Sequence, residues 1–299
     1  MSLLLCSCEH KDLDFEGVAG LTVKFDWSSV NFANPSYMML AAFTNTSQPI
    51  QKHIEGNSNG FIKLPVGTYN LISYNGDIED LSSRGSTWEE FEIYSLPVNL
   101  VDVSRMFANT RAIPKGTGTE NQDFVNEPNE LWTAANSNVE VTGQVGETIK
   151  MNMESATYDL HFTIKNVQNM EFINEVLATI SGMSESWYPA QHRCSETLCI
   201  IPFQLISDGN SFEGVVRTFG YRKEDNPQHK LVIYSEMTTG SKLYYTFDVS
   251  DAINNAVASG SGDVYIELEE LPLPKPVEGN TGLQPDVVDW EEVLIPLPM

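Results

Sequence analysis

The chain has 299 residues, enough for two domains or one large one, each able to bury its own core. Hydrophobic residues make up 41% of it and charged residues 19%, a composition typical of a globular protein and not of a disordered or collagen-like chain. The 41 acidic and 17 basic residues give a net charge of −24, which argues against nucleic acid and anionic lipid headgroups as partners of the folded body.

The first eight residues, MSLLLCSC, are an apolar run that ends on a cysteine. Lipoprotein signal peptides end with a branched apolar residue, a small residue and the cysteine that receives the lipid, and Leu5, Ser7 and Cys8 occupy these positions. The run is shorter than the usual ~7–15 apolar residues, which a start codon placed too late would explain. We therefore predict that residues 1–18 are a truncated lipoprotein signal and tether, with Cys8 lipidated and the lipid as the only membrane contact. The alternative is a chance occurrence of these residues.

Most of the chain alternates apolar and polar residues with a period of two, the pattern of half-buried strands. This predicts strands at residues 21–27, 39–43, 61–64, 69–74, 91–94, 139–142, 149–153, 158–165, 198–205, 212–218, 231–235, 243–247 and 264–268. Many short strands separated by turn signals favour β-sandwiches or barrels over βαβ units. Helical spacing is limited to residues 251–258 and 170–180.

Residues 113–138 are polar and rich in turn residues, and they interrupt this rhythm. We predict an N-terminal β-sandwich domain over residues 19–120, a linker over 121–138 and a C-terminal β-sandwich domain over 139–272. Residues 273–299 form a proline-rich tail that ends on a potential donor strand, with Trp290, Val293 and Ile295 as its apolar points. This strand either completes the sheet of another subunit or folds back on its own domain.

Five segments occur in order along the chain: the cysteine-terminated apolar run, VKFDW at 23–27, LPVGTYNLISYN at 64–75, SGM at 181–183 and DVVDWEEVLIPLP at 286–298. With them the chain resembles a fimbrillin-like family of Bacteroidales outer-membrane lipoproteins, related to type V pilins. The resemblance implies an all-β fold of two Greek-key, transthyretin-like β-sandwich domains in tandem with an extended C-terminal tail. It also implies a lipid-anchored place at the cell surface, partnership with other fimbrial subunits by strand exchange, and a host or bacterial surface receptor.

In polymerising members of that family, a protease that cuts after arginine frees the N-terminal strand, and a neighbour's terminal strand fills the groove. The first arginine here is Arg84, so such a cut would remove several strands instead of one. We therefore expect an anchoring, accessory or tip-like fimbrial subunit in adhesion, and not a shaft pilin. The alternative is a surface lipoprotein that binds a glycan or a protein and never polymerises.

Motifs for catalysis and metal binding are weak in this sequence. Residues 56–60 match the G-x-S-x-G of hydrolases, but a predicted strand follows Ser58 where the hydrolase elbow requires a helix, so we interpret them as a hairpin turn. The five histidines show no metal-ligand spacing. We expect no enzymatic activity, no metal and no cofactor.

Two further sets of residues each have two interpretations. Cys194 and Cys199, with four residues between them, either close a small disulfide loop in an oxidising compartment or stay separate as buried thiols. Tryptophans in or near predicted loops either stack on sugar rings or fill the core. These tryptophans are Trp88, Trp132, Trp187 and Trp290.

Overall fold

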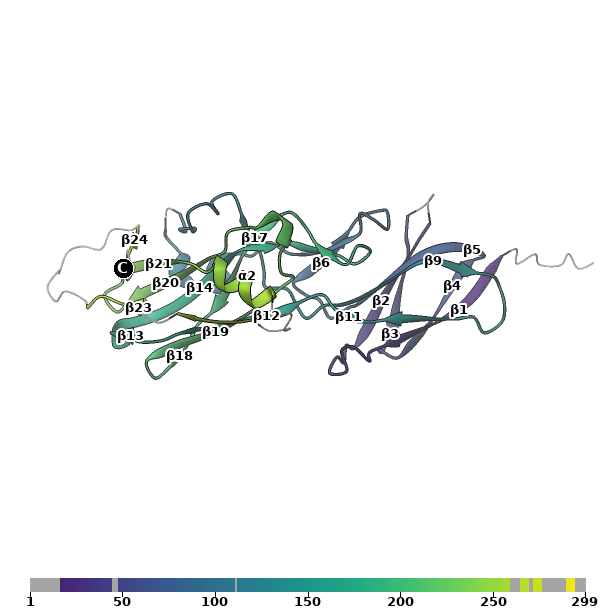
Figure 1. Cartoon of the computed structure of the whole chain (residues 1–299), viewed down its shortest axis with the longest axis horizontal. Coiled ribbons are helices and arrows are strands. Elements are labelled where there is room, and N and C mark those ends of the chain that lie inside the picture. Colours follow the sequence, from purple (N-terminus) through teal and green to yellow (C-terminus); the bar gives the residue numbers. More distant parts are fainter. Residues whose placement is uncertain are drawn as a thin grey trace, which may run out of the picture.

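The computed structural model describes residues 17–44, 48–110, 112–258, 264–268, 271–275 and 289–293. The protein is all-β, as predicted, and its described strands form six sheets. Figure 1 shows an elongated molecule in which two groups of sheets follow one another along the long axis. Within the described ranges, no helix combines the length and the apolar character needed to span a membrane.

The first sandwich consists of two sheets packed face to face. Its three-stranded sheet has the order β10 (Thr148–Asn152), β1 (Val18–Asp26) and β4 (Asn59–Pro65). Its five-stranded sheet has the order β11 (Glu154–Ser155), β9 (Trp132–Val141), β5 (Gly67–Asn75), β2 (Tyr37–Phe43) and β3 (Ile50–Glu55). Alternate residues of β1, Leu21, Val23 and Phe25, are buried between the sheets because the side-chain period of a strand is two.

The second sandwich is larger and also has two main sheets. The four-stranded sheet has the order β18 (Ile206–Asp208), β19 (Ser211–Thr218), β12 (Tyr158–Ile164) and β22 (Val264–Leu268). The six-stranded sheet has the order β24 (Trp290–Glu292), β21 (Lys242–Asp248), β20 (Lys230–Met237), β14 (Ile173–Ser184), β17 (Leu198–Gln204) and β8 (Asp123–Phe124). Phe162 and Phe203 stack between the two sheets, with ring centroids 5.2 Å apart.

Two small sheets and short helices complete the fold. A two-stranded sheet joins β13 (Val167–Gln168) to β23 (Leu271–Pro272). A four-stranded sheet has the order β16 (Arg193–Cys194), β15 (Ser186–Tyr188), β7 (Glu92–Ser95) and β6 (Leu81–Arg84). The helices are α1 (Leu100–Val103), α2 (Ser250–Ala258) and the short 3₁₀ turns η1 (Arg105–Phe107), η2 (Met170–Phe172) and η3 (Lys223–Asp225).

A shared apolar cluster joins the two sandwiches. It contains Phe43 and Ile72 from the outer face of the five-stranded sheet, Phe91 and Ile93 around β7, and Trp187 from β15. The Phe43 and Phe91 rings meet edge to face, with centroids 5.4 Å apart. Because these side chains are buried together, the junction is a packed core and not a solvated linker.

The segments that form each sandwich differ from the predicted domain boundaries. Strands β9 and β10, which fall largely in the predicted linker and C-terminal domain, pair with β5 and β1 of the first sandwich. Strand β8 falls in the predicted linker and pairs with β17 of the second sandwich. Strand β7, inside the predicted N-terminal domain, pairs with β15. We therefore propose that residues 17–75 and 132–155 make up the first unit, and that most of the remaining described chain belongs to the second.

Two local predictions are corrected by the structure. The predicted helix over residues 170–180 is the 3₁₀ turn η2 followed by β14, which lies between β17 and β20 and has an almost fully buried second half. Burial on both faces makes apolar spacing uninformative in this segment. Residues 56–58 do not turn a hairpin, because β3 pairs with β2 and β4 pairs with β1. The turn is a corner between two sheets, and no helix follows Ser58.

The local backbone conformation explains why the SGM segment contains a glycine, Gly182. It lies at a register shift between β14 and β17 and has φ of +81°, a conformation that side-chain-bearing residues rarely adopt. A Cβ at this position would lie 2.4 Å from the Gln228 carbonyl oxygen. The Gly182 N–H donates to the Gln122 side chain at 2.8 Å. The bulge thus bonds β14 to Gln122 and lets the backbone of β14 pass close to Gln228.

Candidate functional site

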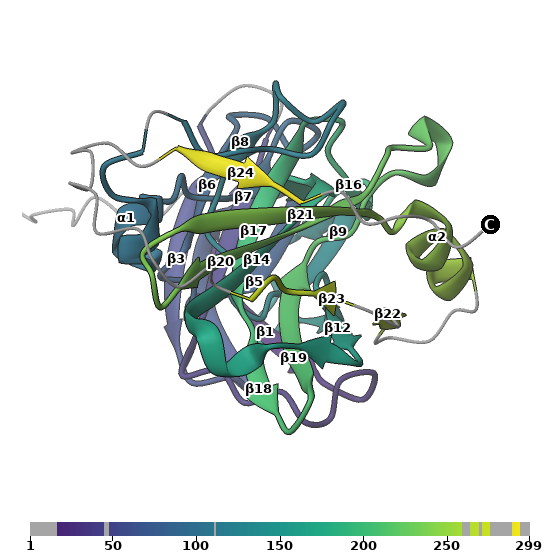
Figure 2. The ribbon, with the colours of Figure 1, turned by 90° about the vertical axis from the view of Figure 1, so that its left-hand side faces the viewer.

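The described end of the C-terminal tail, residues 289–293, lies on the second sandwich of the same chain. Strand β24 pairs in parallel with β21 in the register Lys242 to Trp290 and Tyr244 to Glu292. The Val293 N–H continues the ladder by donating to the Tyr244 carbonyl at 3.0 Å. Figure 2 shows β24 alongside β21 as the outermost strand of the six-stranded sheet. Of the two arrangements left open by the sequence, the described part of the tail adopts the folded-back one.

Trp290 is the main apolar contact of this tail. Its ring meets Tyr234 edge to face, with centroids 5.2 Å apart, and lies 5.8 Å from the Phe107 ring. The Lys242 ammonium is 5.7 Å from the Trp290 ring centroid, within range of a cation–π contact. The indole N–H of Trp290 is buried without a hydrogen-bond acceptor among the described residues. The surrounding side chains therefore pack against the Trp290 ring but leave its indole N–H without a hydrogen bond.

Part of the surface under the Trp290 ring comes from a distant part of the sequence. The segment that contains α1 and η1 covers the outer face of β14, β20 and β21, where Leu100, Met106 and Phe107 pack with Leu177 and Tyr234. The Tyr234 hydroxyl donates to the Pro114 carbonyl at 2.5 Å. We call Phe107, Tyr234 and Lys242 the tail seat.

Lys242 ties this covering segment to the sheet. Its buried ammonium donates to the Met106 carbonyl and, at 3.1 Å, to the Ala108 carbonyl. Burial lowers the pKa of Lys242 below its ordinary value. The two carbonyls at the end of η1 are thus capped by a side chain that lies more than 130 residues later in the chain.

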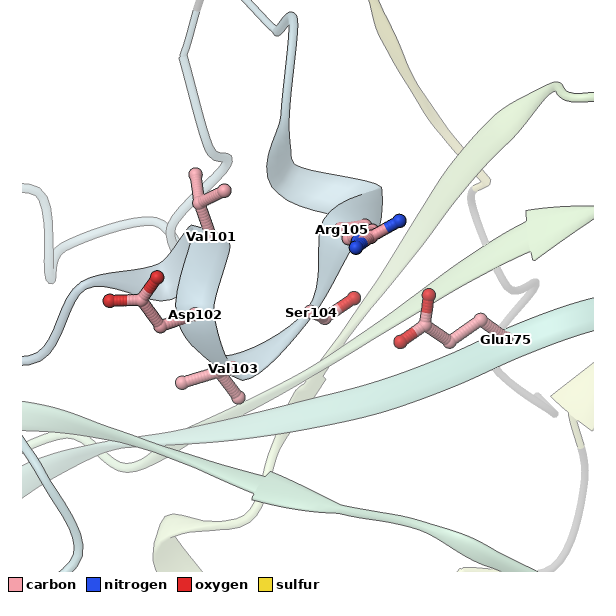
Figure 3. A pocket seen from close by; sticks show the side chains of 6 residues that line it. All are labelled: Val101, Asp102, Val103, Ser104, Arg105 and Glu175. Carbon is pink, nitrogen blue, oxygen red and sulfur yellow. The ribbon is translucent and has the colours of Figure 1, made fainter.

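An open depression of about 510 Å³ lies beside this segment. Val101, Asp102, Val103, Ser104 and Arg105 line it on one side and Glu175 on the other. Figure 3 shows Glu175 reaching from β14 toward the turn that carries Ser104 and Arg105. The Ser104 hydroxyl accepts the Met106 N–H at 3.1 Å, so it serves as a helix cap. The lining contains no histidine or cysteine, and its second carboxylate, Asp102, lies across the depression from Glu175 in Figure 3.

A smaller cleft of about 200 Å³ lies between the sandwiches. Arg217 dominates its charge: its guanidinium lies 2.9 Å from Asp159 and 3.7 Å from Glu130. The backbone N–H of Arg217 donates to the Glu127 carboxylate at 2.8 Å, while burial raises the pKa of that carboxyl above its ordinary value. These ion pairs connect β12 and β19 with the segment that leads into β9. Because the charged groups that line this cleft pair with one another, we interpret it as a structural contact between the two sandwiches.

The predicted loop tryptophans pack against the protein. Trp132 and Trp187 are buried, and Trp88 and Trp290 are half-buried. Trp132 meets Trp27 edge to face at 5.9 Å in the first core, and Trp88 packs against the junction cluster. Of the two interpretations, core and interface packing is the one that these residues show.

Cys194 and Cys199 are both buried with free thiols. The Cys194 thiol donates to the Phe219 carbonyl at 3.0 Å, and burial raises its pKa to about 11. Burial also raises the pKa of Cys199, which lies in the second core. The arrangement is that of two separate buried thiols, which are chemically inert in the protonated form.

Two of the predicted site residues, Cys8 and Ile295, lie outside the described residues. Lys242 and Tyr234 were missed by the sequence reasoning. The uninterrupted apolar run LVIY at 231–234, typical of a strand covered on both faces, could have indicated Tyr234, whereas no local signal marks Lys242. No cluster of histidine, cysteine or carboxylate side chains able to hold a metal occurs in the described ranges.

Comparison with known proteins finds a family model, a relative and solved structures that are similar to this chain. A family model described as a domain of unknown function, DUF5119, matches residues 7–204. A protein of Bacteroides ovatus provisionally named fimbrium anchoring subunit Fim4B is 21% identical, and the match covers 96% of this chain and 92% of the relative.

Solved structures of two proteins have the same fold. A provisionally assigned adhesin from Bacteroides ovatus superposes with a TM-score of 0.63 at 20% identity, covering 98% of this chain and all of that one. The fimbrial anchor protein Mfa2 of Porphyromonas gingivalis superposes with a TM-score of 0.53 at 12% identity, covering 84% of this chain and 90% of that one. The resemblance to fimbrial proteins of Bacteroidales that the sequence predicted is confirmed.

Proposed function

The chain belongs to the DUF5119 family, and on that premise we propose that it is a fimbrial subunit of the bacterial cell surface that anchors or accompanies a fimbrium. Its full-length similarity to a fimbrium anchoring subunit supports this role. We further propose that both sandwiches are transthyretin-like Greek-key domains and that a lipid at Cys8 holds the protein at the outer membrane. A protein of this kind acts through surfaces and strand edges and carries out no reaction.

The position of β1 favours an anchoring or accessory role over polymerisation. Strand β1 is the central strand of its sheet, hydrogen-bonded to β10 on one side and to β4 on the other. The first arginine, Arg84, lies in β6, beyond five strands that build the first sandwich. Its guanidinium is paired with Glu92 at 2.5 Å. Cleavage there would separate β1 to β5 together, so it would not open a groove of one strand's width.

We propose that contact with other fimbrial subunits is made at the edge of β21. Strand β24 pairs with only residues 242–244 of this seven-residue strand and leaves the Trp290 indole N–H unsatisfied. A longer strand from a neighbouring subunit would pair along more of β21 and would displace β24. The tail strand would then be free to pair elsewhere.

Removal of the protein from its native host tests the proposal. We expect cells without it to release their fimbriae into the medium, and cells that carry Cys8→Ser to release both the fimbriae and the variant protein. The wild-type gene returned to the deletion strain is the control. N-terminal sequencing of the mature protein is expected to begin at Cys8, and a mature protein that begins at Gly85 in assembled fimbriae would overturn the anchoring role.

The packed tryptophans favour this proposal over the glycan-binding alternative. Their rings are buried or half-buried, so no indole face forms an open platform in the described part of the chain. If cells that lack the protein retain their fimbriae and the protein binds a glycan on an array, glycan binding would be favoured over fimbrial anchoring.

A further inference from the structure

Exposed apolar side chains gather at the end of the first sandwich that is farthest from the second. The start of β1, the turn between β4 and β5 and the turn between β9 and β10 meet there (Figure 1). Val18 is 53% exposed, Val66 is 51% exposed and Val145 is fully exposed. We call these three valines the tip.

Contacts between the three segments bring the regions that carry the tip valines side by side. Val18 lies opposite Pro65 in the β1 to β4 register, and the Val66 N–H donates to the Gly17 carbonyl. A Cβ on Gly143, in the turn that carries Val145, would lie 3.3 Å from the Val66 side chain. Aliphatic residues at the ends of three adjacent segments form one apolar surface, whereas exposed aliphatic residues elsewhere on a protein are usually scattered singly.

A basic sheet face continues from the tip. The outer face of the three-stranded sheet carries Lys24, Lys63 and Lys150, and the Lys150 ammonium forms an ion pair with Asp26 on the same face. Lys24 and Lys150 are directly opposite one another on β1 and β10. The nearby Glu147 carboxylate is turned into its own loop, where it accepts the Thr142 N–H at 2.9 Å. Three lysines against Asp26 and Glu147 leave this surface with a small positive charge, in a chain whose net charge is −24.

Phe61 lies among these lysines. Its ring is 53% exposed and covers Gly20, where a Cβ would come within 2.4 Å of it. An aromatic ring flanked by lysine side chains is typical of surfaces that meet the headgroup region of a bilayer, because the ring sits at the interface and the ammonium groups pair with phosphates.

We propose that the tip and the adjoining lysine face dock on the phospholipid surface of the membrane to which the chain is tethered. Only eight residues, 9–16, lie between Cys8 and Gly17, so this tether spans at most about 30 Å. An acyl group at Cys8 therefore keeps this end of the molecule, and not the tail seat, next to the bilayer. The proposal rests on the proposed lipid anchoring and adds an orientation: the second sandwich points away from the membrane. It also revises the expectation that the folded body avoids anionic headgroups.

The docking contact is expected to orient the protein and not to replace the lipid. Three valines and one ring give a shallow, reversible contact, weaker than a pair of acyl chains. A Cys8→Ser variant would then leave cell membranes during washing and still bind vesicles when lipid is abundant.

Vesicle flotation with the full chain carrying Cys8→Ser tests the docking surface. We expect this protein to float with phosphatidylethanolamine vesicles that contain phosphatidylglycerol, and to float less with vesicles of phosphatidylcholine alone. A Val66→Asp, Val145→Asp double variant is expected to lower the partition coefficient at least about tenfold. Ile206→Asp is the matched control, because Ile206 is an aliphatic residue 71% exposed on β18 of the second sandwich, and we expect it to leave partitioning unchanged.

Several outcomes would overturn this inference. They are absence of flotation with either vesicle, equal flotation of the tip variant and the Ile206→Asp control, or a dimer in sedimentation that the tip variant abolishes, which would assign the tip to a second copy of the chain. Unchanged circular dichroism and unfolding temperature show that the variants fold. If vesicles bind the tip while cells without the protein retain their fimbriae, the anchoring function fails and the docking surface stands.

Discussion

Replacement of Trp290 by alanine should release the tail from the second sandwich. The side chain is half-buried, so its removal exposes roughly 100 Å² of apolar surface, which is worth about 2.5 kcal/mol. The loss of two aromatic contacts, with Phe107 and Tyr234, adds about 1 kcal/mol. A total of about 3.5 kcal/mol corresponds to a change of roughly 300-fold in the equilibrium between docked and released tail.

Hydrogen exchange at the Val293 amide measures this equilibrium. That N–H donates to the Tyr244 carbonyl only while the tail is docked, so its protection in Trp290→Ala should fall by up to about 300-fold, or to the level of an unprotected amide. Glu291→Gln is the control, because Glu291 is an exposed residue of the same strand and its replacement should leave the protection unchanged. Equal protection of Val293 in the wild type and in Trp290→Ala would refute the view that the ring holds the tail.

Three further predictions concern the second sandwich. Burial lowers the pKa of His229 to about 4, below its ordinary value of 6.5, so between these pH values the unfolded chain binds more protons than the folded chain. The free energy of unfolding should therefore fall by about 2–3 kcal/mol from pH 6.5 to pH 4. Denaturant titrations should show this part of the pH dependence in the wild type and not in His229→Gln. Gly182→Ala should lower the free energy of unfolding by about 2 kcal/mol or more, because of the positive φ and the close Gln228 carbonyl, and a stability equal to the wild type would contradict the account of the bulge. Alkylation should leave Cys194 and Cys199 unlabelled in the native protein and label both in denaturant, whereas a bridged peptide in non-reducing mass mapping would show that a disulfide forms.

Alternation along the chain was a reliable guide wherever one face of a strand meets a core and the other meets solvent. Residues 21–27, 149–153 and 158–165 were predicted as strands on this basis, and β1, β10 and β12 occupy these segments. The same rule failed for β14, because a strand covered on both faces has no polar side to mark its period. The predicted helix at residues 251–258 is confirmed as α2.

The assignment of segments to the two sandwiches depended on pairing partners far apart in the sequence. Strand β10 lies about 125 residues after β1 and pairs with it in parallel, and β8 joins a sheet whose other strands begin some 50 residues later. Local composition indicates whether a segment is exposed to solvent, but not which strand it pairs with. The polar stretch at 113–138 therefore indicated a domain boundary, whereas the structure has strands of both sandwiches there.

By itself, the sequence determined the all-β class, most of the strands, the apolar points of the tail and the resemblance to fimbrial proteins, because each of these is written in local periodicity or in short motifs. Only the tertiary structure decided where the described tail lies and what holds it. The seat of Trp290 combines Phe107, Tyr234 and Lys242, three residues spread over more than 130 positions. Burial of a shared apolar surface brings them together, and no local pattern records which distant segments share it.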